Sequence, residues 1–280
     1  MLFARFFVVL WLCLAALPAC AATIDLPSVN VLADPSLSLP LSELARKYSQ
    51  KNNVTILVVL EPVKRQMERI ENGESADIFI SPEDENIQEL KLRGMLDVYS
   101  LKPLLHNRLA IISPVGSRPP QLDFTSKEAL QAQLNDIEHI PLLAIEDPVL
   151  FSAGRFTAEL LEKPLAMEKA LIPEALAEPR QLSEEDAPSY PNRITLQETE
   201  SLFALMDSKQ ALGITYYTDA IRRKHVRIQA LVPESYHTPI NYQAAVIAGN
   251  NMAPARRFLD YLQTQEAQEI FRKYGFTGVS

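Results

Sequence analysis

Residues 53–81 contain two apolar runs with an amphipathic segment between them. The first run, Asn53-Val-Thr-Ile-Leu-Val-Val-Leu60, is nearly continuous in apolar residues, which is typical of a parallel strand buried on both faces. Pro62 follows at a position where a helix tolerates proline well, and apolar residues then recur at helical spacing. The second run, Ala76-Asp-Ile-Phe-Ile-Ser81, contains the next strand. This order predicts a strand–helix–strand unit of a parallel sheet.

The same alternation of strand and helix patterns extends in both directions along the chain of 280 residues. Two α/β lobes joined by crossing strands fit this order better than one large sheet, so we predict an α/β fold. Lobe 1 is expected to comprise residues 22–107 and 239–280, and lobe 2 residues 108–238. A proline- and glutamate-rich stretch at 171–192 is predicted to be a surface loop inserted in lobe 2. The other predicted strands lie at 28–33, 108–113, 142–145, 213–217 and 241–247.

The segment 1–21 is predicted to be a secretory signal. Its apolar run is too short to cross a bilayer, which requires about 20 apolar residues, and Ala19-Cys-Ala21 fits a small-residue cleavage site. The alternative is a lipoprotein box, Leu17-Pro-Ala-Cys20, in which Cys20 is acylated and retained. Both cysteines of the chain lie in this segment, so a chain cut after Ala21 has no disulfide and no thiolate metal site. These features predict a periplasmic protein.

The charge balance and the motifs argue against several classes of function. The chain has 27 basic and 35 acidic residues, a net charge of −8, and no long basic cluster, so neither nucleic acid nor an anionic membrane surface is an expected partner. Its four histidines are scattered without metal-ligand spacing, and neither a nucleophile elbow nor a phosphate-binding glycine motif occurs. We therefore expect no enzyme, no catalytic residue, no metal and no cofactor.

Several segments together resemble one family of receptors. They are Val31-Leu-Ala-Asp-Pro-Ser-Leu37, Ile145-Glu-Asp-Pro148 with Ser152-Ala-Gly154, Gly213-Ile-Thr-Tyr-Tyr-Thr-Asp-Ala220 and Ala267-Gln-Glu-Ile-Phe-Arg-Lys-Tyr-Gly-Phe276. The family is the substrate-binding proteins of molybdate and tungstate ABC transporters. The resemblance implies a type II periplasmic-binding-protein fold, in which two lobes joined by a hinge of crossing strands enclose a small solute. It also implies an ABC permease as the partner, and we expect the receptor to be a monomer.

Three residues carry the ligand contacts that the resemblance implies. Ser36 and Tyr216 would donate through their hydroxyl groups, and Ala153 through its backbone N–H. A helix start favours an anion because its first N–H groups are unpaired and carry a partial positive charge. Pro35-Ser36, Pro62-Val63 and Ser152-Ala153 are three such predicted starts, so Val63 is a further candidate at the site.

The chain departs from the family pattern at the ligand loops. Leu60-Glu-Pro-Val-Lys64 replaces a small-residue loop that has a second serine, Asp34 replaces a small apolar residue, and Glu146 replaces a glycine. Glu198 falls at a position expected to give a further backbone contact. Asp34 or Glu61 could cap the N–H groups that a ligand would use, and each charge would repel a dianion by about 1 kcal/mol per unit charge at 4 Å in water. Lys64 or Arg65 could offset one such charge.

These departures leave two alternatives open beside an oxyanion receptor. In the first, the same fold binds a cationic, zwitterionic or hydroxyl-rich solute, with Asp34, Glu61 and Glu198 as partners. In the second, the chain is a ligand-free adaptor or sensor module. That alternative predicts lobes that are already closed, with Asp34 or Glu61 filling the cleft.

Overall fold

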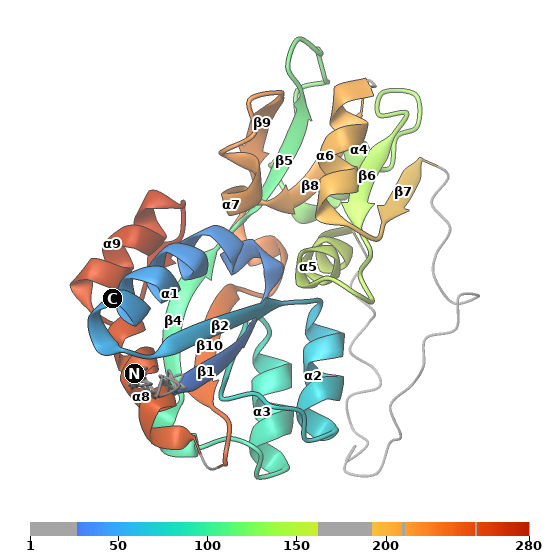
Figure 1. The fold of residues 1–280 in the computed structure, drawn as a ribbon. Helices are drawn as coiled ribbons and strands as arrows, with labels where there is room; N and C mark the ends of the chain where they lie inside the picture. The colour runs from blue at the N-terminus through green and yellow to red at the C-terminus, as the bar shows by residue number, and fades with distance from the viewer. Residues whose placement is uncertain (1–26, 162–191, 209–210, 250, 280) are drawn as a thin grey trace, which may run out of the picture.

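The computed structural model describes residues 27–161, 192–208, 211–249 and 251–279. Within them the chain forms two sheets, each covered by helices, and these make up lobe 1 and lobe 2 (Figure 1). The predicted signal, Cys20 and nearly all of the predicted 171–192 loop lie outside the described residues. None of the described helices has the length and apolar character needed to cross a lipid bilayer.

Lobe 1 is built on a six-stranded mixed sheet with the order β11-β4-β10-β3-β1-β2. Strands β1, β2 and β3 are parallel, as the sequence predicts, and β10 runs antiparallel between β3 and β4. Helices α1, α8 and α9 pack on one face of this sheet and α2 and α3 on the other. The strands are β1 (Ser28–Ala33), β2 (Thr55–Leu60), β3 (Ile78–Ser81), β4 (Lys102–Asn107), β10 (Ile240–Val246) and β11 (Thr277–Gly278). The helices are α1 (Ser38–Asn52), α2 (Val63–Glu71), α3 (Asp84–Leu92), α8 (Met252–Leu262) and α9 (Gln265–Lys273).

The alternation of side chains along β1 explains why both faces of this sheet are covered. Val31 and its neighbours on the same face join the core under α1, α8 and α9, whereas Leu32 joins the core under α2 and α3. Strand β2, however, is the edge strand of the sheet, and Leu57 is 48% exposed. The prediction that this strand is buried on both faces is therefore wrong, because a continuous apolar run does not reveal whether a strand has a second neighbour.

Lobe 2 contains a five-stranded sheet with the order β7-β6-β8-β5-β9. Helices α4 and α5 pack on one face and α6 on the other. The strands are β5 (Leu109–Pro114), β6 (Leu143–Glu146), β7 (Arg193–Leu196), β8 (Leu212–Tyr216) and β9 (Val226–Leu231). The helices are α4 (Lys127–Leu134), α5 (Ser152–Leu161), α6 (Thr199–Ser208) and the short α7 (Tyr217–Ala220).

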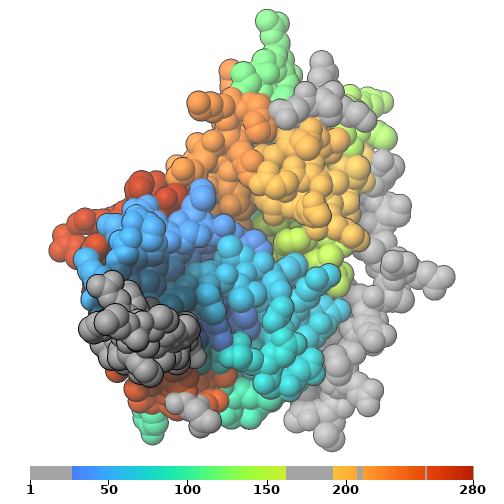
Figure 2. Space-filling model, viewed as in Figure 1, coloured from blue at the N-terminus to red at the C-terminus, as the bar shows by residue number. Residues whose placement is uncertain are grey.

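Two connections between described strands join the lobes. β4 of lobe 1 leads into β5 of lobe 2 with only Arg108 between them, and β9 returns to β10 through residues 232–239. The lobes meet where β1, β6 and β8 end, and the space-filling view shows their surfaces in contact (Figure 2). The chain thus brings loops from both sheets to one junction.

Candidate functional site

The junction between the lobes is centred on Asp34, which directly follows β1. Its carboxyl group is 5% exposed and accepts hydrogen bonds from Ser36 N (2.9 Å) and Ser36 Oγ (2.5 Å). Asp34 therefore caps the short 3-10 helix η1 (Pro35–Leu37), which runs directly into α1. This confirms the expectation that Asp34 takes the N–H group at the first helix start.

A chain of hydrogen bonds leads to the Asp34 carboxylate. Ser36 Oγ lies 2.7 Å from the hydroxyl of Tyr242, which is 3.3 Å from Nδ2 of Asn107. The Ser36 hydroxyl has one hydrogen and gives it to Asp34, so Tyr242 donates to Ser36 and Asn107 donates to Tyr242. The chain of donors ends at Oδ1 of Asp34, which accepts directly from the N–H and the hydroxyl of Ser36. The same arrangement could stabilise an oxyanion in place of the carboxylate.

Two hydroxyl groups of lobe 2, those of Tyr216 and Ser152, face this junction, and that of Tyr216 has no hydrogen-bond partner among the described residues. Tyr216 is 2% exposed at the end of β8, and its ring centroid lies 6.5 Å from that of Tyr242. Ser152 Oγ is buried at the start of α5. The Ser152 hydroxyl is a hydrogen-bonding neighbour of Asp34 and lowers its pKa, whereas burial raises the pKa of Tyr216 and the charge of Asp34 adds to this effect. A buried hydroxyl group usually has a partner, so that of Tyr216 is available to a ligand.

Gly154 explains how the start of α5 reaches the junction. A Cβ atom on Gly154 would lie 2.5 Å from the carbonyl oxygen of Glu146 and 2.7 Å from the carbonyl carbon of Asp147. Only glycine allows α5 to approach the end of β6 this closely. Ser152 and Ala153, the first two residues of α5, are thereby buried. The expected ligand residue Ala153 thus lies next to the Ser152 hydroxyl.

A second buried carboxyl group faces Asp34 from lobe 2. Glu146, at the end of β6, is 3% exposed and accepts a hydrogen bond of 3.1 Å from Thr215 Oγ1. Burial raises the pKa of Glu146 to about 7, and the charge of Asp34 adds to this effect. Burial likewise raises the pKa of Asp34 to about 6, although the hydrogen bonds from Ser36 oppose the shift. Neither carboxylate forms an ion pair with a described lysine or arginine.

An ion-pair cluster closes the lobes beside these carboxyl groups. Arg155 of α5 in lobe 2 lies 3.0 Å from Glu83 and 3.4 Å from Glu85, both in lobe 1. It also pairs with Glu159 of its own helix at 2.9 Å. The Arg155 guanidinium group is therefore paired with three carboxylates and is not free to neutralise Asp34.

The second helix start of lobe 1 differs from the expectation. Helix α2 begins after Pro62 without a side-chain cap, and the Glu61 carboxylate forms a bidentate ion pair with Arg69 at 2.7 and 2.9 Å. The prediction that Glu61 caps this helix is wrong, because Arg69 of the same helix holds the carboxylate. Val63 is buried in the core under α2, while Lys64 is exposed. The structure therefore does not bring Glu61 or Lys64 to the Asp34 junction.

A cavity of about 570 Å³ adjoins the junction, and both lobes line it. Glu198 lies in its wall together with Ser36, so the structure brings these two expected residues to one space. The sequence did not identify Tyr242, Asn107 or the cavity residues of lobe 2 other than Glu198, and it named Ser152 only as part of a helix start. The only signal for Tyr242 was its place in a strand pattern, because its contact with Ser36 spans 206 residues of chain. The cavity is lined by Pro35, Ser36, Ser38, Leu39, Pro40, Leu60, Pro62, Phe151, Glu198, Thr199, Glu200, Thr218, Asp219, Arg222, Arg223, Tyr274 and Phe276.

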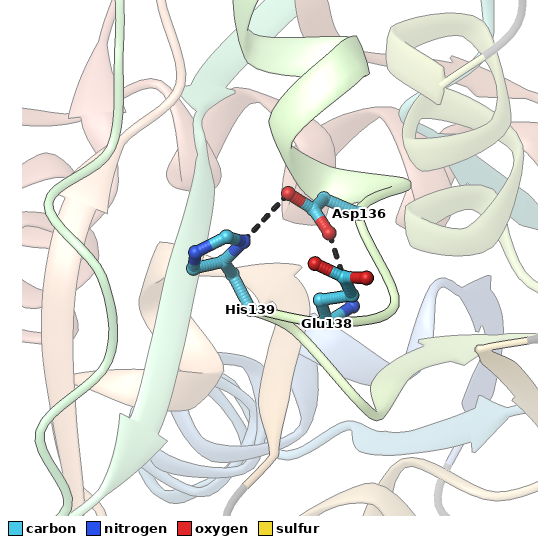
Figure 3. Close-up of side chains that lie close together, drawn as sticks. All are labelled: Asp136, Glu138 and His139. Carbon is cyan, nitrogen blue, oxygen red and sulfur yellow. Dashed lines mark hydrogen bonds and ion pairs between the residues drawn. The ribbon is translucent and has the colours of Figure 1, made fainter.

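One further cluster of ligand-type atoms occurs in the described part of the chain, in the turn after α4. Asp136, Glu138 and His139 place their ligand atoms within 4.8 Å of one another (Figure 3). His139 Nδ1 is 2.7 Å from Asp136 Oδ2, and the backbone N–H of Glu138 donates to Asp136 Oδ1 at 3.0 Å. The hydrogen bond to His139 lowers the pKa of Asp136. These contacts are those of an exposed turn in which an aspartate holds the following residues.

Comparison with known proteins places this two-lobed structure in a family. The family model of bacterial extracellular solute-binding proteins matches residues 29–277. The chain belongs to this family. It is 29% identical over 257 residues to the molybdate-binding protein ModA of Escherichia coli strain K12, a match that covers 91% of each chain.

Solved structures of solute-binding proteins share the fold. The periplasmic molybdate-binding protein of Azotobacter vinelandii superposes with a TM-score of 0.65 at 16% identity, over 90% of this chain and 100% of that one. The tungstate-binding protein TupA of Desulfovibrio alaskensis G20 superposes with a TM-score of 0.63 at 12% identity, over 91% and 99%. The two-lobed type II periplasmic-binding-protein fold that the sequence predicts is thereby confirmed.

Proposed function

We propose that the chain is a periplasmic receptor of the molybdate and tungstate class, which binds a small solute between its lobes and delivers it to an ABC permease. The observation that supports this proposal is that Ser36 of lobe 1 and Ser152 and Tyr216 of lobe 2 lie close to Asp34, with Ala153 directly after Ser152. Relatives named for molybdate and tungstate binding support it. The chain would act as a monomer, exported by the signal at its N-terminus.

The ligand would be held by donors from each lobe. Ser36 would donate its hydroxyl from lobe 1, while Tyr216 would donate its hydroxyl and Ala153 its backbone N–H from lobe 2. A solute bridging these groups would stabilise the closed arrangement of the lobes, and the two strand connections would act as the hinge. The closed form would then be the one that the permease recognises.

The carboxyl groups make oxyanion binding depend on pH in this proposal. Ionised Asp34 occupies the Ser36 donors and, with ionised Glu146, repels a dianion. Protonation removes both effects, and a protonated carboxyl group can donate a hydrogen bond to the ligand. The pKa values of about 6 for Asp34 and about 7 for Glu146 set the range of this change. Oxyanion affinity should therefore be higher at pH 5.5 than at pH 8.

A thermal-shift titration with molybdate, tungstate and sulfate at both pH values tests the proposal. A ligand in thousandfold excess over its Kd should add about 4 kcal/mol of stability. Ser36→Ala should weaken binding by about 1–3 kcal/mol, because a polar ligand atom loses its partner. Ser75→Ala is the matched control, since it removes an exposed hydroxyl of lobe 1 that bonds only to Asn30. Unchanged affinity in Ser36→Ala would remove Ser36 from the site.

The two buried carboxyl groups favour a second candidate function, the binding of a cationic, zwitterionic or hydroxyl-rich solute. Such a solute would donate hydrogen bonds to Asp34 and Glu146 and supply the positive charge that the described residues do not place beside them. Asp34→Asn separates the two candidates because its expected effects have opposite signs. It should strengthen the binding of an oxyanion and weaken the binding of a cation. A screen of amines, amino acids and sugars without any thermal shift would argue against this candidate.

The closed lobes also favour the alternative of a ligand-free module. Asp34 fills the junction as that alternative predicts, and Arg155 holds the lobes together. The buried Tyr216 hydroxyl, which has no partner among the described residues, favours a receptor over such a module, because a junction that serves only packing does not need a free hydrogen-bonding group. If neither oxyanions nor the solutes of the second screen stabilise the protein, the ligand-free module is the remaining function.

A further inference from the structure

The interlobe cavity beside Asp34 is larger than a single oxyanion requires. Its volume of about 570 Å³ lies within the ~300–1,000 Å³ typical of pockets that hold organic small molecules. A tetrahedral oxyanion displaces only a few water molecules, each with about 30 Å³ of liquid volume. The cavity therefore has room for an organic solute that carries the anionic group.

The walls of the cavity combine apolar and polar parts, as pockets for organic solutes do. Leu39, Leu60, Phe151 and Phe276 supply apolar surface from both lobes. Residues that carry hydroxyl groups line the same space, Ser36 and Ser38 from lobe 1 and Thr199 and Thr218 from lobe 2. Such a lining can hold a carbon skeleton and hydrogen-bond the groups attached to it.

Two neighbouring arginines in the wall have different roles. Arg223 donates to Glu200 at 2.9 Å and lies over the ring of Phe203, so its charge is compensated. Arg222 lies over the ring of Tyr274, 4.7 Å from its centroid, and forms no ion pair with any carboxylate in the described part of the chain. A guanidinium group stacked on an aromatic ring keeps its edge free for a bidentate anion.

The position of Arg222 is fixed by contacts between the lobes. Arg222 follows α7 of lobe 2, whereas Tyr274 ends α9 of lobe 1 and donates its hydroxyl to Glu43 at 2.9 Å. Gly275 has a φ of 94°, and a Cβ atom there would lie 2.5 Å from Cδ1 of Ile221. Glycine thus permits the close approach that seats Arg222 on Tyr274 when the lobes are closed.

We infer that this cavity binds a small organic anion, whose carboxylate or phosphoryl group pairs with Arg222 and whose hydroxyl or ammonium donors reach Asp219 in the same wall. The inference rests on the proposed interlobe receptor and names its substrate class. Asp219 lines the cavity with Arg222, and burial together with Glu146 and Asp34 raises the pKa of its carboxyl group well above the usual range. One wall therefore offers both a cation and a carboxyl group that can accept or, when protonated, donate a hydrogen bond. A hydroxy acid, an amino acid or a small phosphate ester has the matching pair of groups.

Calorimetric titration of the full mature chain with 2-phosphoglycerate, malate, glutamate, orthophosphate and molybdate tests this inference. At least one of the three organic anions should bind more tightly than orthophosphate. Arg222→Gln should weaken that binding by about tenfold or more, because a charge-assisted bidentate contact is lost. Lys224→Gln is the matched control, since Lys224 is exposed, lies two residues away and does not line the cavity. It makes the same change in net charge and should alter the affinity by less than about twofold.

The outcomes separate this inference from the proposed function. Binding of molybdate with equal affinity in the wild type and in Arg222→Gln, without binding of any organic anion, would overturn the inference and leave the receptor proposal intact. Equal losses in Arg222→Gln and Lys224→Gln would also overturn it, because the effect would then be one of net charge. If none of the five probes binds, both the inference and the oxyanion receptor fall.

Discussion

The ends of β1 and β2 are two neighbouring regions with similar sequences and different outcomes. The strands are parallel, with Ala33 opposite Leu60, and each is followed by an acidic residue and a proline before a helix. Glu61 binds Arg69 and remains partly exposed, whereas Asp34 is buried, caps its own helix start and has no ion-pair partner among the described residues. The same local motif thus gives a surface ion pair in one place and a buried carboxyl group in the other.

The difference arises from what each helix and the opposite lobe supply. Arg69 stands eight residues after Glu61, but the residue eight positions after Asp34 is Ser42, which carries no charge. Ser152 and Glu146 of lobe 2 then cover Asp34 and remove it from water. The pKa of Asp34 therefore depends less on the sequence of its own loop than on the groups of lobe 2 that pack over it.

The largest effect is expected at Glu146, which faces Asp34. Burial raises the pKa of Glu146 from 4.5 to about 7, because the folded protein favours the neutral carboxyl group. The stability that goes with this neutral form is fully present below pH 4.5 and is lost as the pH rises through 7. The glutamine of Glu146→Gln does not ionise. The free energy of unfolding of this variant should therefore exceed that of the wild type by about 3 kcal/mol at pH 8 and by little at pH 4.5. Urea unfolding at several pH values measures this difference. The exposed Glu68→Gln is the control, and a difference independent of pH would contradict the buried-carboxyl interpretation.

The next effect concerns the ion pair that holds the lobes over Asp34. Arg155→Gln leaves Glu83 buried without its cation and should lower the free energy of unfolding by about 2 kcal/mol. It should also open the lobes and increase the radius of gyration in small-angle scattering. Arg93→Gln, which breaks an exposed ion-pair cluster within lobe 1, should do neither. An unchanged radius would show that Arg155 is not needed for closure.

Asp34→Asn tests whether the charge of the buried Asp34 carboxylate opposes the binding of an oxyanion. The amide keeps an oxygen that can accept from Ser36 but removes the charge that repels a dianion. Molybdate affinity should rise by about tenfold at pH 8 and by less at pH 5.5, where the wild-type carboxyl group is largely protonated. Titration at both pH values measures the change. A loss of affinity would instead identify Asp34 as a direct acceptor from the ligand.

Glu61→Gln should have the smallest effect. Its partner Arg69 is 39% exposed, and a pair at the surface contributes little to stability and is screened by salt. We expect a slight fall in Tm at low salt that disappears in about 0.5 M salt, with unchanged solute affinity. An affinity change as large as that of Asp34→Asn would mean that the end of β2 also belongs to the site.

The amino-acid sequence was sufficient for features that depend on near neighbours. Periodicity predicted the parallel strands β1, β2 and β3 and the helix between β2 and β3, because burial imposes repeats of two and 3.6 residues on the chain. The capping of Ser36 by Asp34 was also predictable, since it spans only two residues. The family followed from short segments spread along most of the chain, and the family-model match confirms it.

Long-range packing settled the properties of the site. The edge position of β2 depends on which strands pair, and the chain from Asn107 through Tyr242 to Ser36 joins residues far apart in sequence. The burial of Asp34 opposite Glu146 and the position of Arg222 over the ring of Tyr274 exist only because lobe 2 packs on lobe 1. Desolvation and ion pairing depend on distance in space, and a sequence gives that distance only for residues a few positions apart.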